Sequence, residues 1–327
     1  MLRTLARRAL VGLAVVGGVV TLTFVLLHAA PGDPAERLLG PTATTEQLAA
    51  GRRALGLDRP LPVQFFEWLG RAARGEWGTS LATGRPVRAM LGAAWPATVR
   101  LVLLSLLLSY GLGLVVGTLQ AARSRSRLDT ALSVVSVTLV ALPGYWLGLM
   151  LVVVFTYWLR MLPAFGAAGF DADYLGGWAR LADGLRHLAL PLATLTLIGI
   201  GGAARFVRGA MLDALAQPFV VAARAKGLSA SRVLVHHAVR HALIPVITLL
   251  GLSLPALFSG AVFVEFVFAW PGVGRVLVEA VQARDYPVVM AATTISAVLV
   301  VLGNLLADVA VAVADPRVRA LEERVDA

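Results

Sequence analysis

Three histidines in one short polar segment, His236, His237 and His241, are the first candidates for chemistry in this sequence. His237 and His241 are four residues apart, a spacing that presents two imidazoles to zinc on one helix face. Arg232 and Arg240 lie in the same segment without a nearby carboxylate, so its positive charge would repel a cation. We therefore predict no metal site and interpret the histidines as part of a solvated, partly protonated helix face.

The sequence lacks the motifs of nucleophilic and phosphate chemistry. It contains no cysteine, no G-x-S-x-G elbow and no G-x-x-x-x-G-K-[ST] phosphate loop. No catalytic residue is therefore predicted, the chain is not expected to be an enzyme, and it is expected to bind no cofactor itself. If the chain serves an ATP-driven process, ATP and Mg²⁺ must be bound by a partner chain.

Two carboxylates, Glu265 and Asp308, stand inside long apolar runs. An ionisable side chain at such a position is costly and usually faces a bundle interior or water. Asn304 precedes Asp308 by one helical turn, so the two side chains share a helix face. Two interpretations stay open: these residues line a translocation path, or they form buried polar clamps. Glu265 is close enough to Trp270, near the membrane interface, for its carboxylate to snorkel toward water.

The polar segment at residues 217–242 must position most of these groups. It reads QPFVVAARAKGLSASRVLVHHAVRHA and carries no acidic residue. Residues 219–226 favour a short Ala-rich helix, and Gly227 supplies a flexible position at which a helix can end and turn. Ser229 is a candidate N-cap for a second helix. An ordered helix–glycine–helix element between two apolar runs indicates a docking surface rather than a tether.

The spacing within this segment resembles the EAA loop of ABC-importer permeases, in which Glu-Ala-Ala is followed by three residues and a glycine. Ala222, Ala223 and Gly227 occupy the corresponding positions, whereas Val221 replaces the glutamate and Arg240 stands where the pattern usually has proline. The longer string AARAKGLS…HHAVRHALIPV is similar to one branch, the first permease subunit of dipeptide and oligopeptide importers, which also includes nickel and glutathione importers. The strings LLHAAPGDPAERLLG, GTSLATGRPV and ARDYPVV resemble other segments of that branch, so the resemblance covers nearly the whole chain.

The resemblance implies a set of partners and roles. Two related permease chains pair as a heterodimer, two cytoplasmic ABC ATPases dock on their EAA loops, and an external solute-binding protein delivers the cargo. A peptide is the cargo implied first, with nickel, glutathione or another small solute as alternatives. The residues implied to couple this chain to an ATPase are Ala222, Ala223, Arg224, Ala225, Lys226, Gly227, Leu228 and Ser229.

Composition independently indicates a membrane protein. Of the 327 residues, 58% are hydrophobic and 15% are charged, and the mean hydropathy is +0.79. The net charge of +10 comes from basic residues in short segments beside the apolar runs, and no basic and aromatic face of the nucleic-acid-binding kind is present. We therefore expect the chain to contact a lipid bilayer and no nucleic acid.

Six apolar runs approach or exceed the length needed to cross a bilayer core of about 30 Å. They cover approximately residues 9–30, 98–121, 128–159, 187–206, 243–268 and 287–314. The resemblance gives these six transmembrane helices the type I ABC-importer permease fold, which is all-α. The first run is longer than the apolar part of a signal peptide, so we expect it to be retained. The third is overlong and contains Pro143-Gly144, which predicts a kink or tilt.

Two smaller patterns accompany the spans. Gly113 and Gly117 form a GxxxG pair that permits close helix packing, although chance also produces this pattern in a Gly-rich apolar chain. Between the first and second spans, Thr44 or Thr45 begins a small helix that ends at Gly56, and residues 61–74 form an amphipathic helix. We therefore predict a small helical segment outside the membrane.

The distribution of charge predicts the orientation. Arg3, Arg7 and Arg8 precede the first run, and the other short arginine-rich segments fall on the same side once six spans are threaded. This places both termini in the cytoplasm, and the resemblance implies the cytoplasmic membrane of a bacterium or archaeon. The chain then divides into a cytoplasmic tail with the first span (1–30), an external segment (31–97), a five-span permease core that includes the loop (98–315), and a cytoplasmic tail (316–327).

Two other function classes are compatible with the apolar runs alone. An ion-coupled secondary transporter or channel needs no ATPase and often shows repeated halves, and no clear internal repeat is visible in the sequence. A membrane enzyme would need a nucleophile with a nearby base, which the motif search does not find. Co-purification of cytoplasmic ATPases with the chain would separate these classes from an ABC permease.

Overall fold

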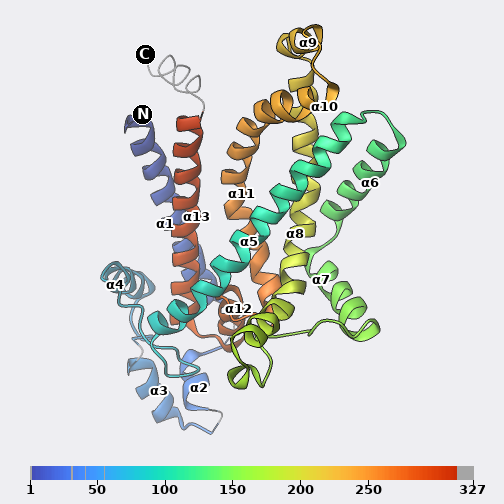
Figure 1. Ribbon diagram of the computed structural model, residues 1–327. Coiled ribbons are helices and arrows are strands. Elements are labelled where there is room, and N and C mark those ends of the chain that lie inside the picture. The colour runs from blue at the N-terminus through green and yellow to red at the C-terminus, as the bar shows by residue number, and fades with distance from the viewer. Residues whose placement is uncertain (1, 31, 41, 55, 315–327) are drawn as a thin grey trace. The chain divides into compact units, whose positions relative to one another are not determined.

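The polypeptide is almost entirely helical in the part that the structure, a computed structural model, describes: residues 2–30, 32–40, 42–54 and 56–314 (Figure 1). Within those ranges the only strand-like pairing is one isolated antiparallel bridge between Thr79 and Pro86. The all-α architecture predicted from the sequence is therefore confirmed for the described residues.

Four helices of the described chain are long and apolar enough to cross a membrane, and a bent pair adds a fifth candidate. The four are α1 (Leu2–Ala29), α5 (Val87–Ala122), α8 (Gly177–Leu215) and α13 (Tyr286–Ala314). The pair consists of α6 (Arg127–Ala141) and α7 (Gly144–Val152), which continues into a π-helical turn at Val153–Trp158. The fifth expected span coincides with α11 (Val239–Val267), several of whose side chains lie outside the described part. Several candidate spans are thus confirmed, and the count of six stays a prediction.

Two of these helices are longer than the apolar runs that predicted them. The apolar run of α8 covers only residues 187–206, and α5 begins at Val87, before the run at 98–121 that predicted it. Charged residues end an apolar run without ending a helix. A proline removes one backbone hydrogen bond, but it does not always end the helix that contains it. The 39 residues of α8 extend over about 58 Å, nearly twice the thickness of the hydrocarbon core. Part of α8 must therefore stand outside the lipid.

The kink predicted at Pro143-Gly144 is a break. The axes of α6 and α7 differ by 103°. Leu142 (φ −73°, ψ 133°) and Pro143 (φ −61°, ψ 130°) both have extended backbones, because the proline ring disfavours the helical conformation of the residue before it. After the break, Gly148 of α7 is buried and leaves room for the ring of Phe268, which would lie 3.1 Å from an added Cβ.

The chain divides into two compact units, and the first contains residues 99–270 with 303–314 of the described C-terminal part. In this unit α8 packs against α6, α7 and α11. Its core includes Leu106 and Tyr110 of α5, Val207 and Met211 of α8, and Val246 of α11. α8 is therefore the central helix of the unit.

The GxxxG pair of α5 forms a close contact with α8. An added Cβ at Gly113 would lie 2.6 Å from the Cβ of Ala203, and one at Gly117 would lie 2.6 Å from the carbonyl oxygen of Ala204. Any larger side chain would push the two helices apart. A pattern that the sequence left indistinguishable from chance is thus a packing contact.

The second unit contains residues 2–98 and 271–302 in its described part. Its shorter helices are α2 (Pro34–Leu39), α3 (Thr45–Ala54), α4 (Leu61–Ala73) and α12 (Val273–Ala283). The small helices predicted near 45–56 and 61–74 are confirmed. Thr44 and Gln47 form a capping box at the start of α3: each backbone N–H donates to the other's side-chain oxygen, at 2.8 and 3.3 Å.

Three separate strings meet in this unit at a cluster that we call the Asp285 corner, made of Gly32, residues 80–82 and residues 284–286. The buried carboxylate of Asp285 accepts hydrogen bonds from the hydroxyl of Ser80 and from the backbone N–H groups of Leu81 (3.1 Å) and Ala82 (3.3 Å). The Tyr286 hydroxyl donates to the carbonyl of Leu27 at 2.6 Å. Gly32 has φ of 120°, and an added Cβ would overlap the guanidinium of Arg284. Gly32, the TSLATG string and the ARDYP string therefore meet in one corner.

Candidate functional site

The polar segment at 217–242 folds as the sequence predicts, into two helical pieces joined at a glycine. α9 (Pro218–Ala225) is followed by Gly227, then by α10 (Ala230–Arg232) and a π-helical turn, Val233–Ala238, that leads directly into α11. Gly227 has φ of 80°, a conformation that a β-branched residue resists. Ser229 occupies the N-cap position of α10, although its side chain makes no capping bond. Residues 217–242 are called the coupling loop below.

The coupling loop has a small core of its own. Val220 and Ala223 of α9 and Val233 are 1%, 7% and 1% exposed and pack together, with Leu215 and Leu228 against them. The backbone N–H of Leu228 donates to the carbonyl of Ala223 at 3.3 Å, which closes the turn around Gly227. Because its two helical pieces share this core, we expect the loop to move as one body.

The outer face of the loop combines small side chains with cations. Six of the eight residues expected to meet an ATPase are exposed, namely Ala222, Arg224, Ala225, Lys226, Gly227 and Ser229. The other two turn inward: Ala223 is buried in the loop core and Leu228 is half-buried. Val221, at the position where the EAA pattern has glutamate, is 66% exposed. The helix–glycine–helix shape predicted from the sequence is therefore confirmed, but the sequence could not distinguish the inner positions of the loop from the outer ones.

The loop is joined tightly to two long helices of the first unit. Only Ala216 and Gln217 separate α8 from α9, and the π-helical turn contacts both α8 and α9. Ala238 and Ala242, which are 0% and 1% exposed, lie in the same core cluster as Met211 of α8. Figure 1 shows α9 projecting beyond the ends of α8 and α11. The loop is therefore both continuous with and packed against these two helices.

The histidines of the loop do not converge on one point. His236 and His241 are exposed and His237 is half-buried. The ring of His241 packs against Phe219 at 5.3 Å between centroids. No group of three or more potential metal ligands occurs among the described residues.

An ion pair that the sequence did not single out ties α6 to α8. Asp129 accepts bidentate hydrogen bonds from Arg208, at 2.7 Å from Nε and 2.8 Å from Nη2, and a third from the backbone N–H of Arg125 at 2.9 Å. The Asp129 side chain is only 5% exposed. Its backbone N–H donates to the hydroxyl of Ser126, the N-cap of α6, so from sequence Asp129 resembles an ordinary acidic residue in the first turn of a helix. A lone acid among three arginines was the available signal, but its partner is 79 positions away.

The three polar residues expected inside spans, Glu265, Asn304 and Asp308, differ in how far their side chains are buried or described. The Glu265 side chain is fully buried, near the end of α11, where its backbone carbonyl accepts a hydrogen bond from the N–H of Trp270 at 2.8 Å. Asn304 of α13 is exposed, and the side chain of Asp308 lies outside the described part of the structure. Their roles as path or clamp residues stay predictions.

The fold and the loop together define a class: a multi-pass helical membrane protein with an ordered polar loop between two long helices. Residues 109–320 match the family described as "Binding-protein-dependent transport system inner membrane component", and residues 1–102 match the N-terminal model of the same kind of protein. The chain belongs to this family of transport permeases. The resemblance seen in the sequence is confirmed, and the chain is a transport subunit rather than an enzyme.

Two relatives are similar to the chain over nearly its full length. It is 38% identical to the oligopeptide transport system permease protein AppB of Bacillus subtilis, over 95% of this chain and 98% of the relative. It is 39% identical to the probable D,D-dipeptide transport system permease protein DdpB of Escherichia coli, over 93% and 94%. A chain of the MetNI methionine ABC transporter, 16% identical, superposes with a TM-score of 0.55 over 70% of this chain and 98% of that one, which shows a shared fold.

Proposed function

We propose that this chain is the permease subunit through which peptides cross the cytoplasmic membrane of a bacterium or archaeon. A second, related permease completes the path as a heterodimer, and an external binding protein delivers the cargo. Two cytoplasmic ABC ATPases bind ATP and Mg²⁺, and one of them docks on the coupling loop. The observation that carries the proposal is the loop itself, which has its own core, an exposed face of small and basic residues, and direct continuity with α8 and α11.

Peptide cargo is supported by the names of the relatives. Besides AppB and DdpB, a di/tripeptide transport permease of Pseudomonas aeruginosa is 37% identical over 98% of this chain. A glutathione transport permease of Salmonella is 35% identical over 92%. Because glutathione is itself a modified tripeptide, we place it next to peptides as the alternative cargo, ahead of nickel.

The proposed orientation has six spans with both termini in the cytoplasm. Residues 31–97 are then external and the coupling loop is cytoplasmic, while the expected tail at 316–327 lies outside the described residues. A reporter fused after Gly75 is expected to register as external and one fused after Arg125 as cytoplasmic. The opposite result at either position would place the coupling loop outside the cell, where it could not meet a cytoplasmic ATPase, and would contradict the proposal.

The proposed mechanism follows from how the loop is built. ATP binding closes the two ATPases and displaces the loop, which moves as one body because Val220, Ala223 and Val233 hold its two pieces together. α8 and α11 follow, since both are continuous with the loop. Asp129 and Arg208 make α6 follow α8, and Gly113 and Gly117 bring α5 with it through close packing. The bundle thus has two arrangements whose balance a partner biases.

For the intramembrane polar residues we propose two roles. The full burial of Glu265 supports a clamp within this chain. The exposure of Asn304 supports contact with the partner permease or the path, together with Asp308 on the same helix face.

The test of the coupling role is the substitution Gly227→Val in the reconstituted transporter. Gly227 has φ of 80° and open space around it, so valine strains the turn without a clash elsewhere. We expect normal insertion, near-complete loss of transport, and loss of the ATPase stimulation caused by loaded binding protein. Gly184→Val is the matched control, because Gly184 lies in α8 with equally open surroundings and no positive φ. Wild-type transport by the Gly227 variant at equal expression would end the proposal.

A further inference from the structure

Helix α4 (Leu61–Ala73) has two apolar faces, of which the rest of the second unit covers only one. The covered face carries Gln64, Phe65 and Trp68, which are half-buried. Phe65 packs edge-on against Phe24 of α1 at 5.2 Å between centroids, and Phe65 and Trp68 join a cluster with Val20, Phe24 and Met290. This face fixes α4 to α1 and α13.

The second apolar face is open. Val63, Phe66 and Leu69 are 42%, 67% and 42% exposed. Their spacing of three residues places them on one side of the helix, and the middle one, Phe66, lies about a third of a turn from the midpoint of Phe65 and Trp68. The polar side of α4 is a narrow stripe carrying Glu67 and Arg71, both exposed, beside the half-buried Gln64. A helix that is apolar on nearly every side except one charged stripe is poorly suited to water.

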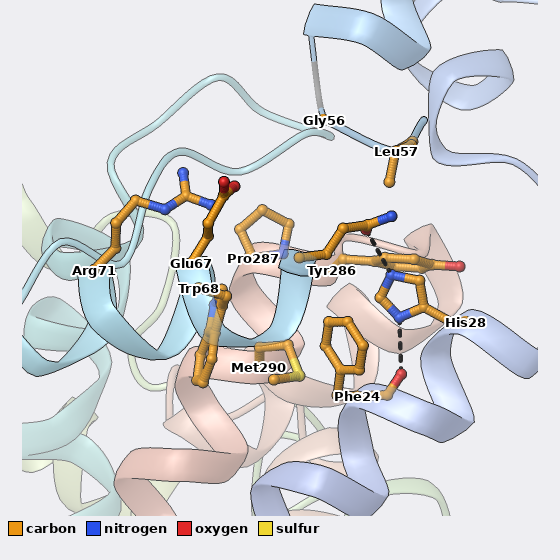
Figure 2. Close-up of a pocket in the computed structure, with 11 residues that line it drawn as sticks. Phe24, His28, Gly56, Leu57, Glu67, Trp68, Arg71, Tyr286, Pro287 and Met290 are labelled. Atoms are coloured by element: carbon orange, nitrogen blue, oxygen red, sulfur yellow. Dashed lines mark hydrogen bonds between the residues drawn. The ribbon is translucent and has the colours of Figure 1, made fainter. Parts of the chain in front are cut away.

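The attachment of α4 lies where two candidate spans end. Figure 2 shows Trp68 beside Met290, and His28 beside Phe24 and Tyr286. The Oε1 atom of Gln64 is 3.3 Å from Nε2 of His28, which is one residue before the end of α1, and Tyr286 is the first residue of α13. Because a span meets the lipid headgroups near its end, α4 is held at the level of the bilayer boundary.

We propose that α4 lies on the lipid bilayer as an interfacial helix, with Val63, Phe66 and Leu69 inserted among the lipid chains. The helix to which α4 is attached also exposes apolar side chains, as a span facing lipid does: Leu22, Val25 and Leu26 in the same half of α1 are 60%, 54% and 59% exposed. Glu67 and Arg71 then face the headgroups and water, as the charged side of an interfacial helix does. The helix anchors the polar segment around it to the membrane surface.

The natural absence of cysteine allows a direct test by site-directed spin labelling. Phe66→Cys and Leu69→Cys place a nitroxide on the open face, and Glu67→Cys places one on the charged stripe of the same helix as a matched control. Each variant is assembled with its partner chains in nanodiscs of phosphatidylethanolamine and phosphatidylglycerol and is first checked for wild-type transport. Collision rates are then measured with oxygen, which concentrates in lipid, and with a water-soluble nickel chelate.

At positions 66 and 69 we expect collisions with oxygen to exceed those with the nickel chelate severalfold, and at position 67 the order reverses. Higher collision rates with the nickel chelate at 66 and 69 would show a helix in water and overturn the proposal. Low rates with both reagents, with an immobile label, would show that another protein surface covers this face and would overturn it equally.

Discussion

The coupling loop and the Asp285 corner hold irregular backbone in place by opposite means. The loop is held by apolar packing among Val220, Ala223 and Val233, while its polar side chains face outward. The corner is held by directional bonds to one buried carboxylate, Asp285, and by a tyrosine hydroxyl. Apolar packing keeps two neighbouring helices together and leaves a free face for a partner. Directional bonds instead fix three segments that are far apart in the chain, and the predictions below test this difference.

The largest effect is expected from Ala223→Glu. The side chain would place a charge in the core of the coupling loop, where it has neither water nor a counter-ion, so the local structure should lose about 3 kcal/mol or more. We expect loss of transport together with rapid tryptic cleavage at Arg224 and Lys226. Ala222→Glu is the control: its side chain points outward, so it should disturb docking while the loop stays resistant to trypsin. Equal protease resistance in both variants would show that the loop core is unimportant.

Asp285→Ala is expected to have the next largest effect, because it removes three hydrogen bonds from the corner at once. Two backbone N–H groups and the Ser80 hydroxyl lose their acceptor, which should destabilise the protein by about 2–3 kcal/mol. The measurement is the midpoint of thermal unfolding in detergent. Asp58→Ala changes an exposed carboxylate of the same unit and should leave the midpoint unchanged. An unchanged midpoint for the Asp285 variant would refute the corner as a structural clamp.

Removal of the Asp129–Arg208 ion pair should have an intermediate effect. Asp129→Asn leaves the Arg208 guanidinium beside a neutral amide and should cost about 2 kcal/mol, less than a fully buried pair because the Arg208 side chain is 30% exposed. Arg208→Gln should cost a similar amount, and the double variant should cost less than the sum. A thermal-unfolding double-mutant cycle measures this coupling. Strict additivity would show that the two side chains do not stabilise each other.

The smallest effect is expected from Tyr286→Phe. The change removes one hydroxyl that donates to the carbonyl of Leu27 and keeps the ring, so the loss should be about 1 kcal/mol. This variant sharpens the comparison because the corner should lose one hydrogen bond and keep its structure, whereas Asp285→Ala removes the carboxylate that three groups share. The midpoints of thermal unfolding of Tyr286→Phe, Asp285→Ala and the variant that combines both changes distinguish these cases. A Tyr286→Phe effect as large as that of Asp285→Ala would mean that the hydroxyl, and not the carboxylate, holds the corner.

The sequence by itself determined the local features of this protein. Apolar runs predicted most of the long helices, since burying about 20 residues in lipid requires them. Pro143 predicted the break between α6 and α7, and Gly227 predicted the turn in the coupling loop, because each restricts or frees its own backbone. These signals are local, so they can be read without knowledge of what each segment contacts.

Only the tertiary structure decided which residues meet. Asp129 pairs with Arg208 across 79 positions rather than with the arginines beside it, and Asp285 binds Ser80 across 205. Ala223 turned out to face inward, although its neighbour Ala222 is chemically identical, because only one of them faces Val233. Gly113 and Gly117 acquired a role from Ala203 and Ala204 of α8. These contacts depend on how whole helices pack against one another, and the sequence of one helix does not determine which other helices lie beside it.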